Sequence, residues 1–158
     1  MQIAVLLYDR FTALDAVGPY EILSRIPGAE VVFTAAQPGP VRTEMTSLAL
    51  SADAALQEVT APDVLLVPGG PGTADLLADE PTLDWIRRVD ETSTWTASVC
   101  SGSLLLGAAG LLTGRRATSH WVCLDHLWAF GASPARERVS STASTPPPPA
   151  SRPESISP

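Results

Sequence analysis

The chain has little positive charge and few cysteines, and each shortage excludes a class of protein. Its 158 residues carry 10 lysines and arginines against 17 aspartates and glutamates, a net charge of −7. Without a basic excess it has no means to bind phosphate backbones, so we expect no nucleic-acid partner. The two cysteines, Cys100 and Cys123, have neither metal-ligand spacing nor the numbers for a disulfide framework.

Long apolar runs are also missing. None reaches transmembrane length, and the start at residues 1–7 is too short and lacks the basic leader of a signal peptide. We therefore expect a cytoplasmic protein with no membrane partner. A chain of this length suits one domain with a substantial core.

What is present is an alternation of apolar strands with amphipathic segments. The pattern predicts an α/β protein, a flavodoxin-like three-layer sandwich around a mostly parallel sheet. Strands are predicted near 2–7, 29–35, 63–67 and 94–99, a hairpin within 38–52, and helices at 14–23, from 73, at 82–91, 104–109 and 121–130.

Cys100 lies between the last predicted strand and an apolar helix that begins near Leu104. A strand, a sharp turn and a helix in this order form a nucleophile elbow, which strains the turning residue and exposes its side chain. The helix N-terminus would then lower the pKa of the thiol. The alternative is that Cys100 is a small buried hydrophobe, the usual fate of a free cysteine.

A glycine-rich loop at 68–72 follows the central strand, at the same edge of the sheet as Cys100. Its composition suits close approach of a reacting group to the backbone. The N–H of Ser101, with that of Gly69 or Gly70, is predicted to stabilise a developing anion. The loop lacks the lysine of a phosphate-binding P-loop.

Three residues are candidates for carrying a proton to or from the thiol. They are Asp15 and Glu21 in the first helix, and His120 after the elbow helix. Spacing alone does not choose among them. Asp15 also suits the N-cap of its helix, and we expect supporting roles for Glu21 and His120.

Three motifs together resemble the ThiJ/PfpI superfamily of the class I glutamine amidotransferase-like fold. They are LDAVGPYE at 14–21, VPGG at 67–70 and SVCSGSLLLGAAGLLTGRRATSHW at 98–121. The resemblance spans about residues 1–139 and is strongest to the isonitrile (isocyanide) hydratase branch. It implies that Cys100 is the nucleophile, Asp15 the acid/base and Ser101 a hydroxyl beside the thiol.

The resemblance further implies that Cys100 adds to the terminal carbon of a small isocyanide, and that water then releases an N-substituted formamide. No metal and no organic cofactor are needed, and relatives commonly form homodimers. The protease-like branch has histidine directly after its cysteine, so Ser101 counts against peptidase activity. Three alternatives stay open: a glyoxalase-like or stress-response hydrolase, a non-catalytic redox-sensing domain, and an inactive fragment.

The composition changes after Val139. Residues 140–158 are rich in serine, threonine and proline, typical of a disordered tail. Read one nucleotide out of frame with GC-rich codons, this stretch resembles the relatives' continuation. We therefore predict an incomplete domain at 1–139 followed by a frameshift product.

Overall fold

The computed structural model describes residues 1–141, so the predicted disordered tail lies almost entirely outside the described residues. A five-stranded sheet in the order β5-β2-β1-β6-β7 forms the centre, and every neighbouring pair is parallel. Its strands are β1 (Gln2–Leu6), β2 (Glu30–Ala35), β5 (Ala54–Ala55), β6 (Val64–Val67) and β7 (Trp95–Ser98).

The two central strands are apolar on both sides. Residues 3–6 of β1 and 65–67 of β6 are all buried, whichever face of the sheet they point to. A continuous apolar run is what a parallel strand needs when helices cover both faces. The sheet therefore forms the middle of the core.

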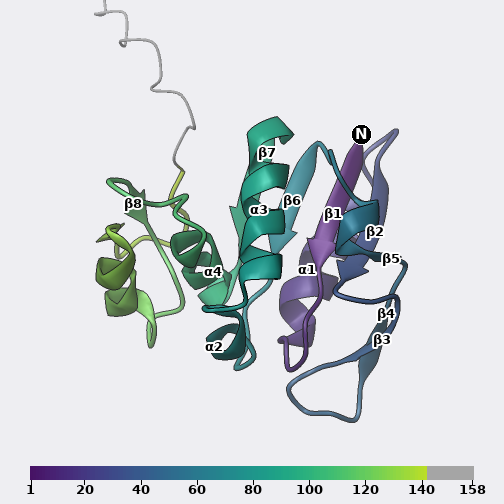
Figure 1. The fold of residues 1–158 in the computed structure, drawn as a ribbon, viewed down its shortest axis with the longest axis horizontal. Helices are drawn as coiled ribbons and strands as arrows, with labels where there is room; N and C mark the ends of the chain where they lie inside the picture. The colour runs from purple at the N-terminus through teal and green to yellow at the C-terminus, as the bar shows by residue number, and fades with distance from the viewer. Residues whose placement is uncertain (142–158) are drawn as a thin grey trace, which may run out of the picture.

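Helices lie on both faces of the sheet. Helix α1 (Ala13–Leu23) connects β1 to β2, whereas α2 (Thr73–Leu76) and α3 (Glu80–Thr92) connect β6 to β7. These connections run outward in opposite directions, so the right-handed crossover rule puts α1 and α3 on opposite faces, as Figure 1 shows. The predicted flavodoxin-like three-layer arrangement is confirmed.

A hairpin of β3 (Gly39–Arg42) and β4 (Ala49–Ala52), paired antiparallel, confirms the prediction for residues 38–52, and the short helix η1 (Leu56–Glu58) follows β5. Beyond α4 (Ser103–Ala108), a small unit contains β8 (Arg116–Ala117), η3 (Leu124–Phe130) and β9 (Ser133–Pro134), with β8 and β9 parallel.

The helix predicted over 121–130 is wrong at its start and in its type. The structure has a 3-10 helix that begins only at Leu124. Trp121 is 81 % exposed, and the buried anchors of η3 are Leu124 and Leu127. The exposed indole gives residue 121 no buried anchor, so the helix begins only where Leu124 packs into the small unit.

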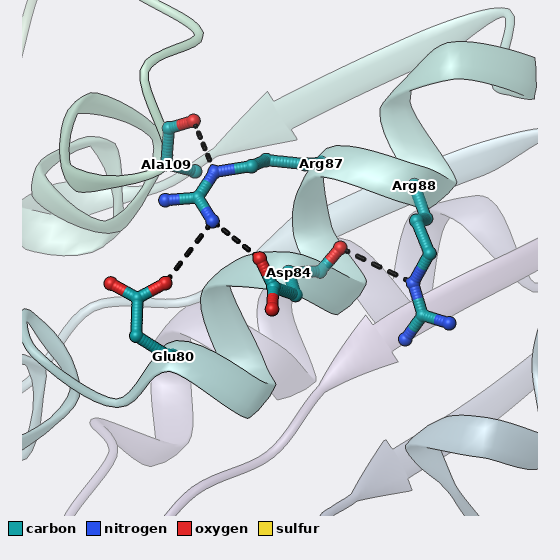
Figure 2. A network of polar contacts seen from close by, with 5 residues as sticks. All are labelled: Glu80, Asp84, Arg87, Arg88 and Ala109. Carbon is teal, nitrogen blue, oxygen red and sulfur yellow. Dashed lines mark hydrogen bonds and ion pairs between the residues drawn. The ribbon is translucent and has the colours of Figure 1, made fainter.

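Arg87 joins α3 to the end of α4 (Figure 2). Its Nε donates to the carbonyl of Ala109 at 2.9 Å, while Nη1 contacts Asp84 at 2.6 Å and Glu80 at 3.3 Å. The last carbonyls of a helix have no partner within the helix, and a guanidinium satisfies one of them here. The contact holds α4, and with it the turn that precedes α4, against the layer of α3.

Strand β7 forms an edge of the sheet within residues 1–141. Its four residues, 95–98, carry no charge and no proline, and Trp95 is 65 % exposed. Unpaired backbone groups on such an edge are a template for pairing with another chain.

Within residues 1–141, no helix is long and apolar enough to cross a membrane.

We expect Trp95→Lys to reduce self-association of the protein, because a lysine on an edge strand disfavours pairing with a second edge. Light scattering at increasing protein concentration measures the effect. Trp128→Lys is the matched control, since Trp128 is 64 % exposed but lies on η3. An equal reduction in both variants would contradict an edge-strand cause.

Candidate active site

Cys100 directly follows β7 and has a backbone conformation that is rare for residues other than glycine. Its φ angle is 57°, in the left-handed region. A non-glycine residue there costs on the order of 1–3 kcal/mol and persists only when its surroundings enforce it. The predicted nucleophile elbow is therefore present.

The strained turn is fixed from two sides. The carbonyl of Cys100 accepts hydrogen bonds from the His120 N–H at 3.2 Å and from the Ser119 hydroxyl at 3.1 Å. Behind the turn, a Cβ on Gly102 would collide with the carbonyl oxygen of Val67. The start of the elbow helix thus packs directly onto the end of β6.

The loop after β6 also approaches the elbow closely. A Cβ on Gly69 would lie 2.6 Å from the Ser101 nitrogen and 2.9 Å from Cβ of Cys100. Such distances exclude any side chain at position 69. Gly70 has a φ of 141°, and a Cβ there would lie 2.6 Å from the nitrogen of Thr12. Gly69 is therefore required by the contact with the elbow after β7, and Gly70 by the contact with the segment that follows β1.

Asp15 lies in the first turn of α1 and does not cap it. The N-cap is Thr12, which makes no side-chain capping bond. The Asp15 carboxylate instead accepts the Gly69 N–H at 3.2 Å and hydrogen-bonds to the thiol of Cys100. Among the three candidate proton carriers, the structure thus brings Asp15 to the thiol.

Burial is the main influence on the charges of this pair. It raises the pKa of Asp15 above 3.8, and the Gly69 N–H and the Cys100 thiol lower it by less. Burial also raises the pKa of Cys100, and the nearby negative charge of Asp15 adds to this, against smaller lowering by the Ser101 N–H.

The predicted lowering of the Cys100 pKa is therefore wrong. The thiol is half-buried beside a carboxylate, and α4 has only six residues to supply a helix dipole. Loss of hydration outweighs a short dipole. Burial and the neighbouring carboxylate thus both favour the protonated thiol.

Ser101 is 5 % exposed, and its hydroxyl accepts the Gly70 N–H at 3.0 Å. The Gly69 N–H is bound to Asp15, and the Ser101 N–H interacts with the thiol of Cys100. The three N–H groups predicted to stabilise an anion are thus already occupied. A developing anion would have to displace one of these internal acceptors.

The side chains of the other two candidate proton carriers, His120 and Glu21, make other contacts. His120 supports Cys100 through its backbone N–H, while its Nδ1 accepts the N–H of Val122 at 3.3 Å. Glu21 is exposed and pairs with Arg25 at 3.3 Å, away from the thiol. The predicted supporting role of Glu21 is not supported, because six positions along the helix turn it to another side from Asp15.

Tyr8 is a residue of the site that the sequence did not reveal. It is 7 % exposed, and its hydroxyl donates to the Pro68 carbonyl at 2.5 Å. Burial raises its pKa, and the negative charges of Asp15 and Cys100 raise it further. It ends an apolar strand with no motif around it, so only its place in the fold shows that it belongs here.

Two cavities of about 820 Å³ and 330 Å³ lie beside the N-terminal part of α3. Tyr8 lines the smaller one, but neither is lined by Cys100 or Asp15. The volumes therefore do not mark the place of the reacting groups, and the chemistry of the Cys100 and Asp15 pair defines the site.

The fold and the site define a class of α/β proteins. Its members have a parallel sheet and a strained cysteine at a strand-to-helix elbow, with a carboxylate beside the thiol. The sequence profile of the DJ-1/PfpI family matches residues 1–144. The chain belongs to the DJ-1/PfpI family.

Three relatives are similar to this chain over most of its length. Isonitrile hydratase of Pseudomonas putida is 42 % identical over 139 residues, 88 % of this chain and 60 % of the relative. A ThiJ/PfpI family protein of known structure from Pseudomonas syringae is 40 % identical with a TM-score of 0.85, over 89 % of this chain and 59 % of that one. A deglycase of Pyrococcus abyssi is 29 % identical over 76 % of this chain and 72 % of its own length. The chain thus spans about 60 % of the length of the first two.

Gly69→Ala is expected to destabilise the fold by about 1–3 kcal/mol, because the added methyl group overpacks the contact with the elbow. Chemical denaturation measures the loss. Gly18→Ala is the control, since its Cβ would meet only an ordinary contact at 3.8 Å within α1. A Gly69→Ala protein as stable as the Gly18→Ala protein would refute the close approach.

Asp15→Asn is expected to stabilise the protein near neutral pH. The folded pKa of Asp15 is raised above the unfolded value, so ionising the carboxyl costs stability. This cost develops as pH rises through the unfolded pKa and is complete above the folded pKa. The gain in melting temperature should therefore be larger at neutral pH than below about pH 3.

The exposed Asp125→Asn, on η3, serves as the surface control for this comparison. A gain from Asp15→Asn that is the same at both pH values would show that charge burial is not its cause.

Proposed function

We propose that the protein is a cysteine-dependent enzyme that hydrates small isocyanides (isonitriles) to N-substituted formamides. The observation that carries the proposal is the hydrogen bond between the Cys100 thiol and the Asp15 carboxyl, both with raised pKa. The terminal carbon of an isocyanide must receive a nucleophile and a proton at the same atom. A thiol and carboxyl that share a proton supply both. The 42 % identity to an isonitrile hydratase supports this choice of substrate.

In the first step, the sulfur of Cys100 bonds to the terminal carbon of the isocyanide. Asp15 accepts the thiol proton and delivers it to that same carbon. The product is a thioimidate, in which carbon is singly bonded to sulfur and doubly bonded to nitrogen. The adduct itself is neutral, and Asp15 ends the step as the carboxylate with which it began, so no second ion forms in the half-buried site.

In the second step, water adds to the thioimidate carbon. Asp15 takes one proton from the water as the water oxygen bonds to carbon, and passes that proton to the substrate nitrogen. The carbon–sulfur bond then breaks as the new hydroxyl becomes the carbonyl, and the hydroxyl proton passes through Asp15 to sulfur. The enzyme is regenerated, and one isocyanide and one water have become one formamide.

Cys100→Ala should lower formamide production by at least about a thousandfold, as removal of a nucleophile does in other enzymes. Proton NMR of the formyl hydrogen measures the product formed from a small alkyl isocyanide. Cys123→Ala is the matched control, because Cys123 is also half-buried but packs in the small unit around η3. Turnover that survives in Cys100→Ala would refute the mechanism.

Asp15→Asn should lower the rate by about a hundredfold to ten-thousandfold, the usual contribution of a general acid/base. The amide keeps an acceptor for the Gly69 N–H but holds no transferable proton. The same NMR assay measures the rate. A variant with near-normal turnover would show that another group carries the proton.

The second candidate is a glyoxalase-like or deglycase activity. The 29 % identity to the Pyrococcus abyssi deglycase favours it. The two functions are separated by substrate: a dicarbonyl or its adduct would be consumed without a formamide. A redox-sensing role is less favoured, since the raised pKa of Cys100 disfavours the thiolate that oxidants attack.

Two further expectations remain proposals. A homodimer acting on a small molecule follows from the resemblance, and sedimentation analysis measures the assembly. The domain boundary at Val139 and the frameshift concern residues mostly beyond 141, outside the described part. Sequencing the DNA across Val139 would test the frameshift. A gene in which no change of frame restores the longer reading frame would overturn that expectation.

A further inference from the structure

One peptide group lies between Tyr8 and Asp15. Its carbonyl, from Pro68, accepts the Tyr8 hydroxyl at 2.5 Å, and its N–H, from Gly69, donates to Oδ2 of Asp15 at 3.2 Å. The structure has no cis peptide bond among residues 1–141, so these groups point in opposite directions across one rigid plane. Tyr8 and Asp15 therefore hold opposite edges of the same peptide.

The plane also packs against Gly102, where a Cβ would lie 2.9 Å from the Pro68 oxygen, but its side-chain hydrogen bonds come from Tyr8 and Asp15. It turns about ψ of Pro68 and φ of Gly69, and glycine allows φ values that other residues avoid. A rotated plane would direct the carbonyl oxygen towards the carboxylate of Asp15, which is repulsive. The hydroxyl of Tyr8 favours the orientation that presents the N–H to Asp15.

The next peptide, between Gly69 and Gly70, is held in a similar way, except that a backbone N–H binds its carbonyl. The Gly69 carbonyl accepts the Thr12 N–H at 2.8 Å, and the Gly70 N–H donates to the Ser101 hydroxyl at 3.0 Å. Both planes thus present an N–H to a side chain of the site. Only the first plane has its carbonyl bound by a side chain, which makes Tyr8 the position where substitution can release that carbonyl.

We propose that Tyr8 is a positioning residue that sets the proton affinity of Asp15 through the peptide between Pro68 and Gly69. The inference rests on the proposed acid/base role of Asp15. Tyr8 is buried, and its hydroxyl bonds to the Pro68 carbonyl rather than to the Asp15 carboxylate itself. Burial and the neighbouring charges raise its pKa, so the phenol remains a donor throughout the neutral range.

Tyr8→Phe is expected to raise the pKa of Asp15 by about 0.5–1 pH unit, because a carboxylate that loses a backbone N–H donor binds its proton more tightly. Carbon-13 NMR of the Asp15 carboxyl, assigned with Asp15→Asn, measures the titration. The other charges that Asp15 senses come from Cys100, Glu44 and His120, which the variant leaves in place.

Trp85→Phe is the matched control. Its Nε1 donates to the carbonyl of Val59 at 2.9 Å in the core, so this variant also removes a buried side-chain donor to a backbone carbonyl. A merely structural Tyr8 would lower the melting temperature, as Trp85→Phe does, without moving the Asp15 titration. An unmoved titration in a folded Tyr8→Phe protein would overturn the proposal.

The hydration assay gives a second, separable result. Tyr8→Phe should lower kcat by about ten- to a hundredfold with KM little changed, as misplacement of a reacting group does. In an Asp15→Asn background it should have no further effect. Failure of the wild-type protein to make formamide would refute the proposed function alone, because the carboxyl titration needs no substrate.

A measurement on the unaltered fold covers the case in which Tyr8→Phe does not fold. The chain has two tyrosines, so fluorotyrosine labelling gives two fluorine signals, and Tyr20→Phe identifies that of Tyr8. This signal should move with the same midpoint as the Asp15 carboxyl. A Tyr8 signal that is constant through that titration would overturn the proposed coupling between Tyr8 and Asp15.

Discussion

The contact between the glycine loop after β6 and the elbow after β7 is the constraint on which the site depends. Neighbouring parallel strands end side by side, so their following turns must share one small space. A Cβ on Gly69 or on Gly102 would collide with neighbouring atoms, so neither turn leaves room for a side chain. This crowding holds Cys100 in its strained conformation and puts its sulfur beside Asp15. Packing, rather than an attractive charge, therefore creates the reactive geometry.

Burial then determines how the site carries its proton. Cys100 and Asp15 both have raised pKa values because they lose hydration; the negative charge of Asp15 raises the pKa of Cys100 further, whereas the thiol lowers that of Asp15 by less. A protease-like thiolate would need a neighbouring cation, such as a protonated histidine. Here the partner is a carboxylate that accepts the thiol proton and returns it to the substrate, which suits addition of a neutral thiol to a neutral substrate. The same burial makes Asp15 costly to ionise, so the site carries a stability cost at neutral pH.

The surrounding layers maintain this arrangement over some distance. Arg87 ties α3 to the last carbonyl of α4 (Figure 2), and residues 119–120 hold the Cys100 carbonyl from the small unit around η3. The elbow is thus supported at both ends of its helix. Strand β7, which leads into it, is covered less well, and Trp95 on it remains exposed. The site is rigid where it borders β6 and more open towards the sheet edge.

The sequence by itself determined the parallel α/β fold, the elbow at Cys100 and the need for glycine after β6. Apolar runs, their length and a short strand-turn-helix pattern are local signals, because each depends on neighbouring residues. The tertiary structure decided which carboxylate meets the thiol, that Glu21 turns away, that residues 121–123 are not helical, and that Tyr8 belongs to the site. It also reversed the expected pKa of Cys100. These depend on distances between segments far apart in the chain and on loss of hydration, neither of which a local pattern contains.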